Sequence, residues 1–379
     1  MINKKSKSIK NYEFNVRSLM VHIGILKSSK QTPLGVTPDS LKKWPTDTTS
    51  FMIEKDAGLL ADISDDEFLL TGAQIVSRTE VIEQSNLLVI SDALTEKDLT
   101  MLPVDTVIVG LLNPHSNKDF TTELKKRNQK AFALELLPRT SIAQSMDVLS
   151  AMASLAGYKS VILAANYFVG YFPMLTTAAG TVPPAKVLVL GAGVAGLQAI
   201  ATAKRLGAVV EAFDVRKVVK EEVESLGAKF IMVEGMQNDM DTGGYATAQK
   251  EEELTAQRKL IHQKVIKADI VITTASIPGK SAPRLIEGTT VDGMKPGSVI
   301  IDLAAASGGN CELTKNEEAI NHSGVNIIGD SQLAYTLTHE ASKLFSVNIF
   351  NFINHLMKGG LEAIDFEDEI VKSTFIGNN

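Results

Sequence analysis

The stretch that decides the fold reads Val187-Leu-Val-Leu-Gly-Ala-Gly-Val-Ala-Gly196. Its first four residues suit a buried parallel strand, and the three glycines that follow have the G-x-G-x-x-G spacing. Gly191 would permit a tight turn from strand to helix, and Gly193 would leave room for a pyrophosphate against bare backbone. Gly196 would let the helix pack closely on the strand, with its amino terminus facing the phosphates. The stretch therefore predicts a dinucleotide-binding turn.

An acidic residue at the end of the next apolar run supports this interpretation. That run ends Glu211-Ala-Phe-Asp-Val-Arg216, which places Asp214 about twenty residues beyond the glycines. A carboxylate there can accept hydrogen bonds from the adenosine ribose hydroxyls and would repel a 2′-phosphate, which favours NAD over NADP. The neighbouring Arg216 would soften that repulsion. Without the acid, an ordinary tight turn would be the simpler interpretation of the glycines.

Composition and charge set broad limits on the fold and function. The chain has 379 residues, 44% of them hydrophobic and 22% charged, which is typical of a soluble globular protein with room for two domains. A net charge of -6 argues against nucleic-acid binding. Cys311 is the only cysteine, so an internal disulfide and a cysteine metal cluster are excluded. We expect Cys311 to be a packed interior thiol, and we expect no metal site because the histidines lack ligand spacing.

Two segments resemble targeting or membrane sequences. Residues 160–185 carry no charged side chain and are long enough to cross a bilayer, but asparagine, glycine and proline residues interrupt them. We therefore expect a buried helix over about 145–172, then a loop, and no membrane insertion. The basic stretch 1–20 lacks a secretory apolar core, so a solvated tail is a better interpretation than a transit peptide.

Apolar runs alternating with helical patterns indicate an α/β fold with two Rossmann-like domains, parallel doubly wound sheets and an interdomain cleft. The expected strands are 19–25, 68–70, 74–76, 86–90, 106–112 and 131–136 in the first set, and 187–190, 209–213, 229–233, 269–273, 298–302 and 326–328 in the second. We predict a first domain of residues 1–138 plus about 332–379 and a nucleotide-binding domain of residues 139–331. A final helix over 347–357 is expected to return to the first domain.

Two loops of the second domain are candidates for ligand contact. Residues 234–251 form a long segment with little to bury, which suits either a lid or an incidental surface insertion. Residues 273–280 follow the carboxyl end of an expected strand, the edge of a doubly wound sheet where ligands bind. An ordinary Pro-Gly turn is the alternative interpretation for this second loop.

Several motifs in one order then resemble a known family. They are Pro138-Arg-Thr-Ser-Ile-Ala-Gln-Ser-Met-Asp147, Leu155-Ala-Gly-Tyr158, the glycine turn, Gly243-Gly-Tyr-Ala246, Thr273-Thr-Ala-Ser-Ile-Pro-Gly-Lys280 and Asp302-Leu-Ala with Gly308-Gly-Asn-Cys311. Together they closely resemble the NAD(H)-binding domain I of proton-translocating NAD(P) transhydrogenase, most strongly over residues 136–328. The related alanine dehydrogenases share the same two-domain plan.

The resemblance assigns Arg139, Gln144 and Asp147 to the nicotinamide and its ribose, with Ser150 one turn further along. The residues agree with this assignment, because positions 144, 147 and 150 would share one face at the start of a helix. A glutamine offers both donors and acceptors, and Asp147 would order Arg139 by a charge-assisted hydrogen bond. The alternative is a plain helix start that uses Ser141 as its cap, with Asp147 solvated.

The resemblance also supplies the remaining cofactor contacts. Tyr245 would be the aromatic gate of a mobile loop, Gln257 would reach the adenine side, and Ser276 stands where the family usually has leucine. The full cofactor-binding set is Gly191, Gly193, Val194, Ala195, Gly196, Asp214, Val215, Arg216, Gly243, Gly244, Tyr245, Ala246, Gln257, Thr274, Ala275 and Ser276.

Three positions separate this chain from alanine dehydrogenases. Those enzymes use an arginine for the substrate carboxylate and a lysine and a histidine for the chemistry. The corresponding positions here are Pro33, Ser91 and Leu111. None of these side chains can bind a carboxylate as a cation or carry a proton at an imine. Amino-acid or oxo-acid dehydrogenation is therefore the weaker alternative, and a non-catalytic NAD-sensing module is another.

The resemblance implies an NAD(H)-binding subunit that passes hydride from NADH to NADP+ held on a partner domain. Hydride transfer between two nicotinamides needs positioning rather than acids or bases, so the absence of such groups is no obstacle. The implied partners are a membrane-spanning transhydrogenase subunit that couples transfer to proton translocation, an NADP(H)-binding subunit and a second copy of this chain. The implied location is the cytoplasmic face of a bacterial plasma membrane.

Overall fold

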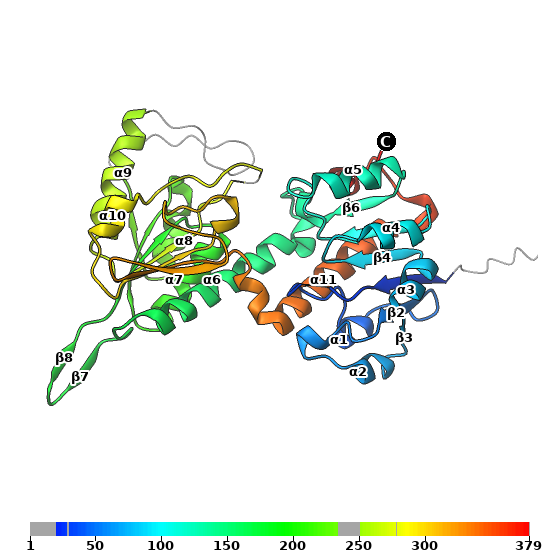
Figure 1. The fold of residues 1–379 in the computed structure, drawn as a ribbon, viewed down its shortest axis with the longest axis horizontal. Helices are drawn as coiled ribbons and strands as arrows, with labels where there is room; N and C mark the ends of the chain where they lie inside the picture. Colours follow the sequence, from blue (N-terminus) through cyan, green and yellow to red (C-terminus); the bar gives the residue numbers. More distant parts are fainter. Residues whose placement is uncertain (1–19, 29, 234–250, 278, 379) are drawn as a thin grey trace, which may run out of the picture.

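The computed structural model describes residues 20–28, 30–233, 251–277 and 279–378. The expected basic tail, residues 1–20, and the expected lid, residues 234–251, lie outside the described residues except for Met20 and Glu251. The described part forms two α/β lobes, each built around its own sheet (Figure 1). The predicted fold class, two domains with parallel-strand sheets, is confirmed.

The first sheet has six parallel strands in the order β3-β2-β1-β4-β5-β6, and the second has seven in the order β11-β10-β9-β12-β13-β15-β14. Only β14 runs antiparallel to its neighbour among the strands of these sheets. The first-lobe strands are β1 (Val21–Ile25), β2 (Thr49–Glu54), β3 (Gln74–Val76), β4 (Leu87–Ile90), β5 (Val107–Gly110) and β6 (Ala131–Ala133). The others are β9 (Lys186–Leu190), β10 (Val209–Phe213), β11 (Lys229–Ile231), β12 (Ile270–Thr273), β13 (Val299–Asp302), β14 (Glu318–His322) and β15 (Val325–Gly329), with the hairpin β7 (Leu175–Thr177) and β8 (Gly180–Val182) apart.

Helices cover both faces of each sheet, as expected where strands are joined by crossover connections. The helices of the first lobe are α1 (Pro38–Leu41), α2 (Asp65–Leu69), α3 (Arg78–Gln84), α4 (Glu96–Met101), α5 (Lys118–Lys126), α11 (Thr338–Leu356) and α12 (Glu369–Thr374). The second lobe has α7 (Val194–Arg205), α8 (Lys220–Ser225), α9 (Glu251–Val265) and α10 (Gly288–Asp292), and α6 (Val148–Tyr167) connects the lobes.

The structure corrects several sequence-based expectations. The apolar run 68–70 belongs to helix α2 and its carboxyl end instead of a strand, while β2 at residues 49–54 and β14 at residues 318–322 were missed. The signal for α2 was present as a capping box, because Ser64 and Glu67 exchange hydrogen bonds at its start. The expected 145–172 helix is shorter, and the loop that follows contains the β7-β8 hairpin. The final helix is longer than expected, since α11 begins at Thr338.

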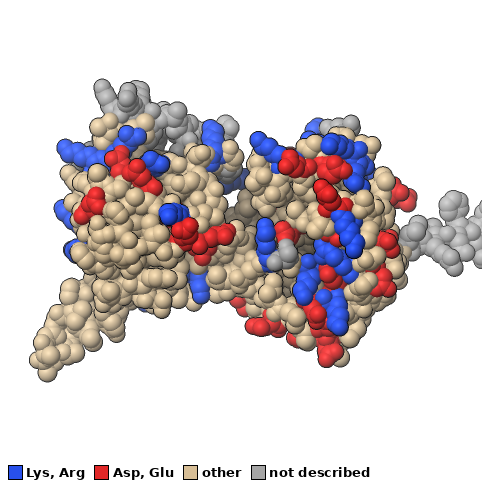
Figure 2. All heavy atoms as spheres, viewed as in Figure 1, with Lys and Arg blue, Asp and Glu red and all other residues tan. Residues whose placement is uncertain are grey.

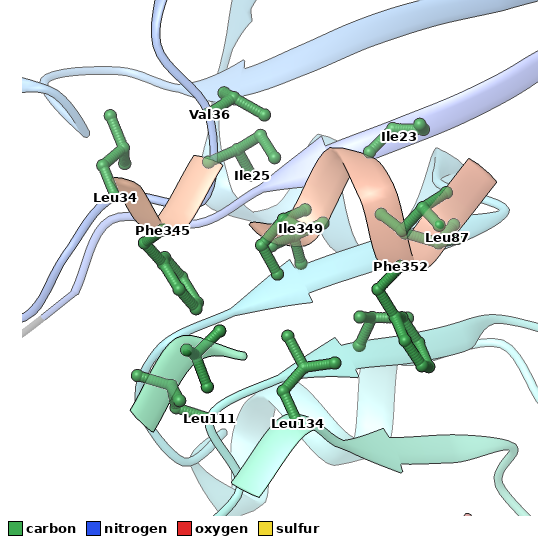
Figure 3. Close-up of a cluster of buried hydrophobic side chains, with 14 of the residues drawn as sticks. Ile23, Ile25, Leu34, Val36, Leu87, Leu111, Leu134, Phe345, Ile349 and Phe352 are labelled. Atoms are coloured by element: carbon green, nitrogen blue, oxygen red, sulfur yellow. The ribbon is translucent and has the colours of Figure 1, made fainter. Parts of the chain in front are cut away.

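Helix α11 brings the end of the chain onto the first sheet. Phe345, Ile349 and Phe352 on α11 are fully buried against strand residues such as Ile23 and Leu87 (Figure 3). Burying large apolar side chains in this way stabilises a fold by about 1.5–3 kcal/mol each. The last helix is therefore part of the first lobe's core.

Helix α6 joins the two hydrophobic cores. Val148 and Met152 near its start pack into the first core, whereas Val161 and Ala164 near its end pack into the second. Gly157 lies between them, and a Cβ at this position would collide with the carbonyl oxygen of Ala195 on α7. The helix that connects the lobes is thus pressed against the first turn of the helix that follows the glycine motif.

Within the described part of the chain, α6 is also the one helix long and apolar enough to cross a membrane by length and composition. In its apolar window 33% is buried inside the protein. This is weak evidence for a span, because core helices pass the same test. Some of its apolar side chains contribute to the two cores.

Candidate functional site

A large cleft lies at the carboxyl edge of the second sheet, facing the segment that leaves the first lobe. Its volume is about 1160 Å³, slightly above the usual range for small-molecule sites and large enough for a dinucleotide. Figure 2 shows the surface hollowed between the two lobes. Four arginines and three carboxylates line the cleft: Arg139, Arg216, Arg258, Arg284, Asp147, Asp214 and Glu222.

The glycine turn forms one wall of the cleft. Gly191 has a φ of 102°, in the region that favours glycine, so the chain can turn sharply from β9 into α7. A Cβ on Gly196 would collide with the carbonyl oxygen of Gly191, whereas one on Gly193 would meet open space. Gly193 therefore borders the cleft, and the first amides of α7 are available to an anion there. These features fit a bound pyrophosphate.

Asp214 follows β10 beside this turn and is only 8% exposed. Its Oδ2 accepts a hydrogen bond of 2.8 Å from the backbone N–H of Ala192, which ties the carboxylate to the glycine turn. Arg216 donates to the same carboxylate from its backbone N–H and from its guanidinium. Asp214 is therefore placed where the nucleotide fingerprint requires an acid, but it is already paired within the chain.

The segment 138–150 forms the opposite wall. Gln144 is exposed in a 3-10 turn, Ala143–Met146, and Asp147 caps the amino terminus of α6. One oxygen of Asp147 accepts from the backbone N–H of Ser150 at 2.9 Å, and the other accepts from its hydroxyl at 2.6 Å. The sequence had suggested that Asp147 orders Arg139 and that residues 144, 147 and 150 share one helical face. Instead, Asp147 caps α6 and Gln144 precedes the helix, although all of these residues border the cleft.

The third wall is the loop after β12, and two buried residues missed by the sequence analysis hold it in place. Asn310 is fully buried, and its side-chain amide bonds to the backbone of Ala275 and to the carbonyl oxygen of Pro283. Beneath it, the buried carboxylate of Asp302 accepts from the backbone N–H groups of Asn310 and Cys311. The only signal for these residues was their place in the family motif, which carries no role for either one.

Cys311 is 1% exposed and free of any disulfide. Burial raises the pKa of its thiol, and the nearby negative charge of Asp302 adds to this effect. A buried thiol with a raised pKa is a poor nucleophile. The expected packed, unreactive role fits these surroundings.

Most of the predicted site residues lie around one cleft. Lining it are Arg139, Gln144, Asp147, Ser150, Gly191, Gly193, Val194, Asp214, Val215, Arg216, Gln257, Thr274, Ala275 and Ser276. Ala195 and Gly196 do not line it, since they lie in the first turn of α7, where it packs on its neighbours. Gly243, Gly244, Tyr245 and Ala246 lie outside the described residues.

The corresponding edge of the first sheet holds a much smaller cavity. Its volume is about 10 Å³, which is room for about one water molecule, and Thr32, Pro33 and Ser91 are among its lining residues. None of the described residues that line it is charged. Leu111, the third position compared with alanine dehydrogenases, is buried in the first core. The described residues of this lobe thus offer no cationic pocket for an oxo acid at this edge.

Family models match both halves of the chain. Residues 27–156 match the family described as Alanine dehydrogenase/PNT, N-terminal domain. Residues 160–379 match Alanine dehydrogenase/PNT, C-terminal domain.

Individual proteins narrow the similarity. The chain is 43% identical over 353 residues to the first part of NAD(P) transhydrogenase subunit alpha from Rhodospirillum rubrum, covering 90% of this chain and 92% of the relative. A crystal structure of transhydrogenase from Sinorhizobium meliloti superposes with a TM-score of 0.84 at 38% identity, covering 93% of this chain and 97% of the other. An L-alanine dehydrogenase structure shares the fold at a TM-score of 0.77 and 24% identity, covering 94% of each chain.

Proposed function

This chain belongs to the alanine dehydrogenase/PNT family, among the NAD(P) transhydrogenase alpha subunits, and on that basis we propose that it binds NAD(H) and passes hydride from NADH to NADP+ on a partner domain. The observation that carries this proposal is the cleft. It combines a glycine turn, an acid at the end of the next strand and the Gln144 segment around one volume of about 1160 Å³.

Each wall has a separate task under this proposal. The amides at the start of α7 bind the pyrophosphate, and Asp214 binds the adenosine ribose. Gln144 and Arg139 orient the nicotinamide end, while the loop 274–276 confines it from the other side. When bound, the reduced nicotinamide supplies the hydride. The protein's contribution is to fix its position and exclude water, because hydride exchange between two nicotinamides requires no proton transfer.

The first lobe supports a transhydrogenase rather than a dehydrogenase. An oxo-acid substrate needs a cation for its carboxylate and a proton donor, but Pro33 and Ser91 border a cavity with room for about one water molecule. The hydride acceptor then arrives on another polypeptide. We propose that this partner holds NADP(H) and that a membrane-spanning subunit couples the exchange to proton translocation. This chain would dock at the cytoplasmic face of the bacterial membrane. We also propose the domain boundaries that the sequence predicts, residues 1–138 plus about 332–379 and residues 139–331.

The direct test uses the full chain with an NADP(H)-binding domain from a related transhydrogenase. We expect NADH-dependent reduction of an NADP+ analogue, measured by absorbance, only when both proteins are present. Pyruvate with ammonium should oxidise no NADH. Tight NADH binding without exchange would contradict the transhydrogenase proposal and favour an NAD-sensing module. NADH oxidation by pyruvate and ammonium would favour the dehydrogenase.

We further propose that the chain forms a homodimer through an uncharged projecting surface. The β7-β8 hairpin extends away from the second lobe (Figure 1), and residues 160–185 around it carry no charged side chain. Apolar residues exposed on this surface are Tyr167, Val169, Tyr171, Met174, Leu175 and Val182. Exposed apolar surface of this kind marks an interaction site, and a second copy of the chain supplies a matching uncharged face.

Solution mass measurement tests the dimer. We expect Met174→Asp combined with Val169→Asp to convert a dimer into a monomer in light scattering, because charges would be buried without partners. The matched control is Val104→Asp, which is similarly exposed on the first lobe and should leave the dimer intact. A dimer that survives the double substitution would place the interface elsewhere.

A further inference from the structure

The carboxylate expected to bind the adenosine ribose is fully engaged within the chain. Oδ1 of Asp214 accepts the backbone N–H of Arg216 at 2.9 Å and its Nε at 3.0 Å. Oδ2 accepts the backbone N–H of Ala192 at 2.8 Å and Nη2 of Arg216 at 2.9 Å. A carboxylate offers about four acceptor positions, and here all four receive a donor.

The two side-chain donors occupy a particular edge of the carboxylate. Nε and Nη2 of Arg216 bind one oxygen each, which is the paired arrangement that arginine forms with carboxylates. The two vicinal hydroxyls of a ribose would bind the same pair of oxygens. The backbone donors of Ala192 and Arg216 hold the carboxylate from other directions and would not be displaced.

We propose that Arg216 is a specificity-determining residue that competes with the adenosine ribose for Asp214. NADH binding then breaks the ion pair between Asp214 and Arg216 and forms two ribose hydrogen bonds. This exchange lowers the affinity for NADH. The released guanidinium lies beside the 2′ position, where it partly offsets the repulsion between Asp214 and a 2′-phosphate. Arg216 thus weakens NADH binding and moderates the rejection of NADPH. This inference rests on the proposed function, since it assumes that NADH occupies the cleft.

The pair is shielded enough for such competition to be measurable. The side chain of Asp214 is 6% exposed and that of Arg216 is 21% exposed, so neither is screened as a surface pair would be. In Arg216→Met the apolar stem is kept, and both backbone donors to Asp214 remain. The carboxylate is therefore still positioned when its competitor is removed.

The experiment measures dissociation constants for NADH and NADPH by isothermal titration calorimetry on the full chain. We expect Arg216→Met to bind NADH about five- to tenfold more tightly and NADPH more weakly than the unmodified chain, a change of about 1–1.4 kcal/mol for NADH. Arg205→Met is the matched control, because Arg205 is exposed at the end of α7 and does not line the cleft. It should change neither constant.

Asp214→Asn separates failure of this inference from failure of the proposed function. If the unmodified chain binds NADH and Asp214→Asn weakens that binding, NADH uses this carboxylate as proposed. Unchanged or weaker NADH binding by Arg216→Met would then overturn the competition alone. If the unmodified chain binds no NADH, the proposed function itself fails. A merely structural Arg216 would weaken both nucleotides together, so opposite changes for NADH and NADPH distinguish the two roles.

Discussion

The two sheets share a strand order but differ in what lies at their carboxyl edges. The first runs β3-β2-β1-β4-β5-β6, and the second repeats this order as β11-β10-β9-β12-β13-β15 before adding β14. Ligands bind such sheets where the strand order reverses, beside the first strand of each unit. At that place the second sheet opens into about 1160 Å³, whereas the first has about 10 Å³.

The connection after the first strand of each sheet explains the difference. After β9 the chain enters α7 within a few residues, so the helix amides face the cleft. After β1 the chain crosses the edge of the sheet before α1 begins at Pro38. Leu34 and Val36 on this crossing are buried in the first core, and the N–H of Leu34 bonds to Ser342 on α11. The same topology therefore leaves the edge after β9 open to a ligand and fills the edge after β1 with Leu34 and Val36. We call these the open edge and the filled edge.

Charges near the two edges differ in the same way. In the first lobe Arg78 is paired with Glu54 and Asp98, so its charge is used for stability. In the second lobe Arg139 lines the cleft, and Arg216 lines it while paired with Asp214, so a ligand would meet both groups there. The comparison shows that a doubly wound sheet gains a ligand site from its loops rather than from its strands. Four substitutions test this view, from the largest expected effect to the smallest.

Closing the open edge should have the largest effect. In Gly196→Val the new side chain collides with the backbone of Gly191, which forces the turn open. We expect the dissociation constant for NADH to rise by about 1000-fold, or about 4 kcal/mol. In contrast, Gly193→Ala should leave the free energy of unfolding within about 0.5 kcal/mol, because its Cβ meets open space. Retained NADH binding in Gly196→Val, measured by calorimetry, would contradict the assignment of the edge.

Freeing the loop after β12, at the open edge, should have the second-largest effect. Asn310→Ala leaves the part-buried N–H and C=O of Ala275 and the C=O of Pro283 without this partner. We expect the free energy of unfolding to fall by about 2–3 kcal/mol in urea titrations and NADH binding to weaken about tenfold. Asn321→Ala, which removes two exposed hydrogen bonds at the β14 strand, should cost less than about 0.5 kcal/mol. Equal effects of both substitutions would rule out a special role for Asn310.

Weakening the filled edge should affect stability alone. Burial tends to raise the pKa of Asp98, but hydrogen bonds from Arg78 and Thr95 outweigh it and lower the pKa from 3.8 to about 2. A lowered pKa stabilises the fold above pH 3.8, and this contribution is lost as the pH falls through about 2. We expect Asp98→Asn to reduce the free energy of unfolding at pH 7 by about 2 kcal/mol. The deficit should shrink below pH 4 while NADH binding at pH 7 stays unchanged; a constant deficit would contradict the linkage.

Altering the wall opposite the glycine turn should have the smallest effect and should appear in the rate alone. Gln144→Asn keeps the amide but withdraws it by one methylene from the nicotinamide end of the cleft. We expect hydride transfer to the partner domain to slow about tenfold, since small misplacements reduce rates strongly. The dissociation constant for NADH should change less than about threefold. Equal losses in both would indicate that Gln144 only binds. Ser145→Ala, exposed on the same segment but not lining the cleft, is the control.

The sequence predicted the open edge better than the filled one. The glycine spacing and Asp214 depend on local geometry, so they could be read directly, and the strands of the second sheet other than β14 lie close to where they were expected. Residues 68–70 were misassigned because a short apolar run fits a strand or a helix equally well. Asn310 could not be identified from the sequence, because its role depends on hydrogen bonds to residues 275 and 283, which only the folded chain brings near it. The pairing of Asp214 with Arg216 was likewise unforeseen, although both residues were named. The domain boundaries and site roles stay predictions.

The contact between Gly157 and Ala195 has a mechanical consequence. Helix α6 is the stiff rod that joins the two lobes, and at its midpoint it presses on the first turn of α7, next to the glycine motif. A hinge rotation of one lobe against the other would therefore shift the first amides of α7, to which we assign the pyrophosphate. Any rotation of the lobes would then be coupled to the proposed nucleotide site through this one helix crossing, where no side chain separates the two backbones.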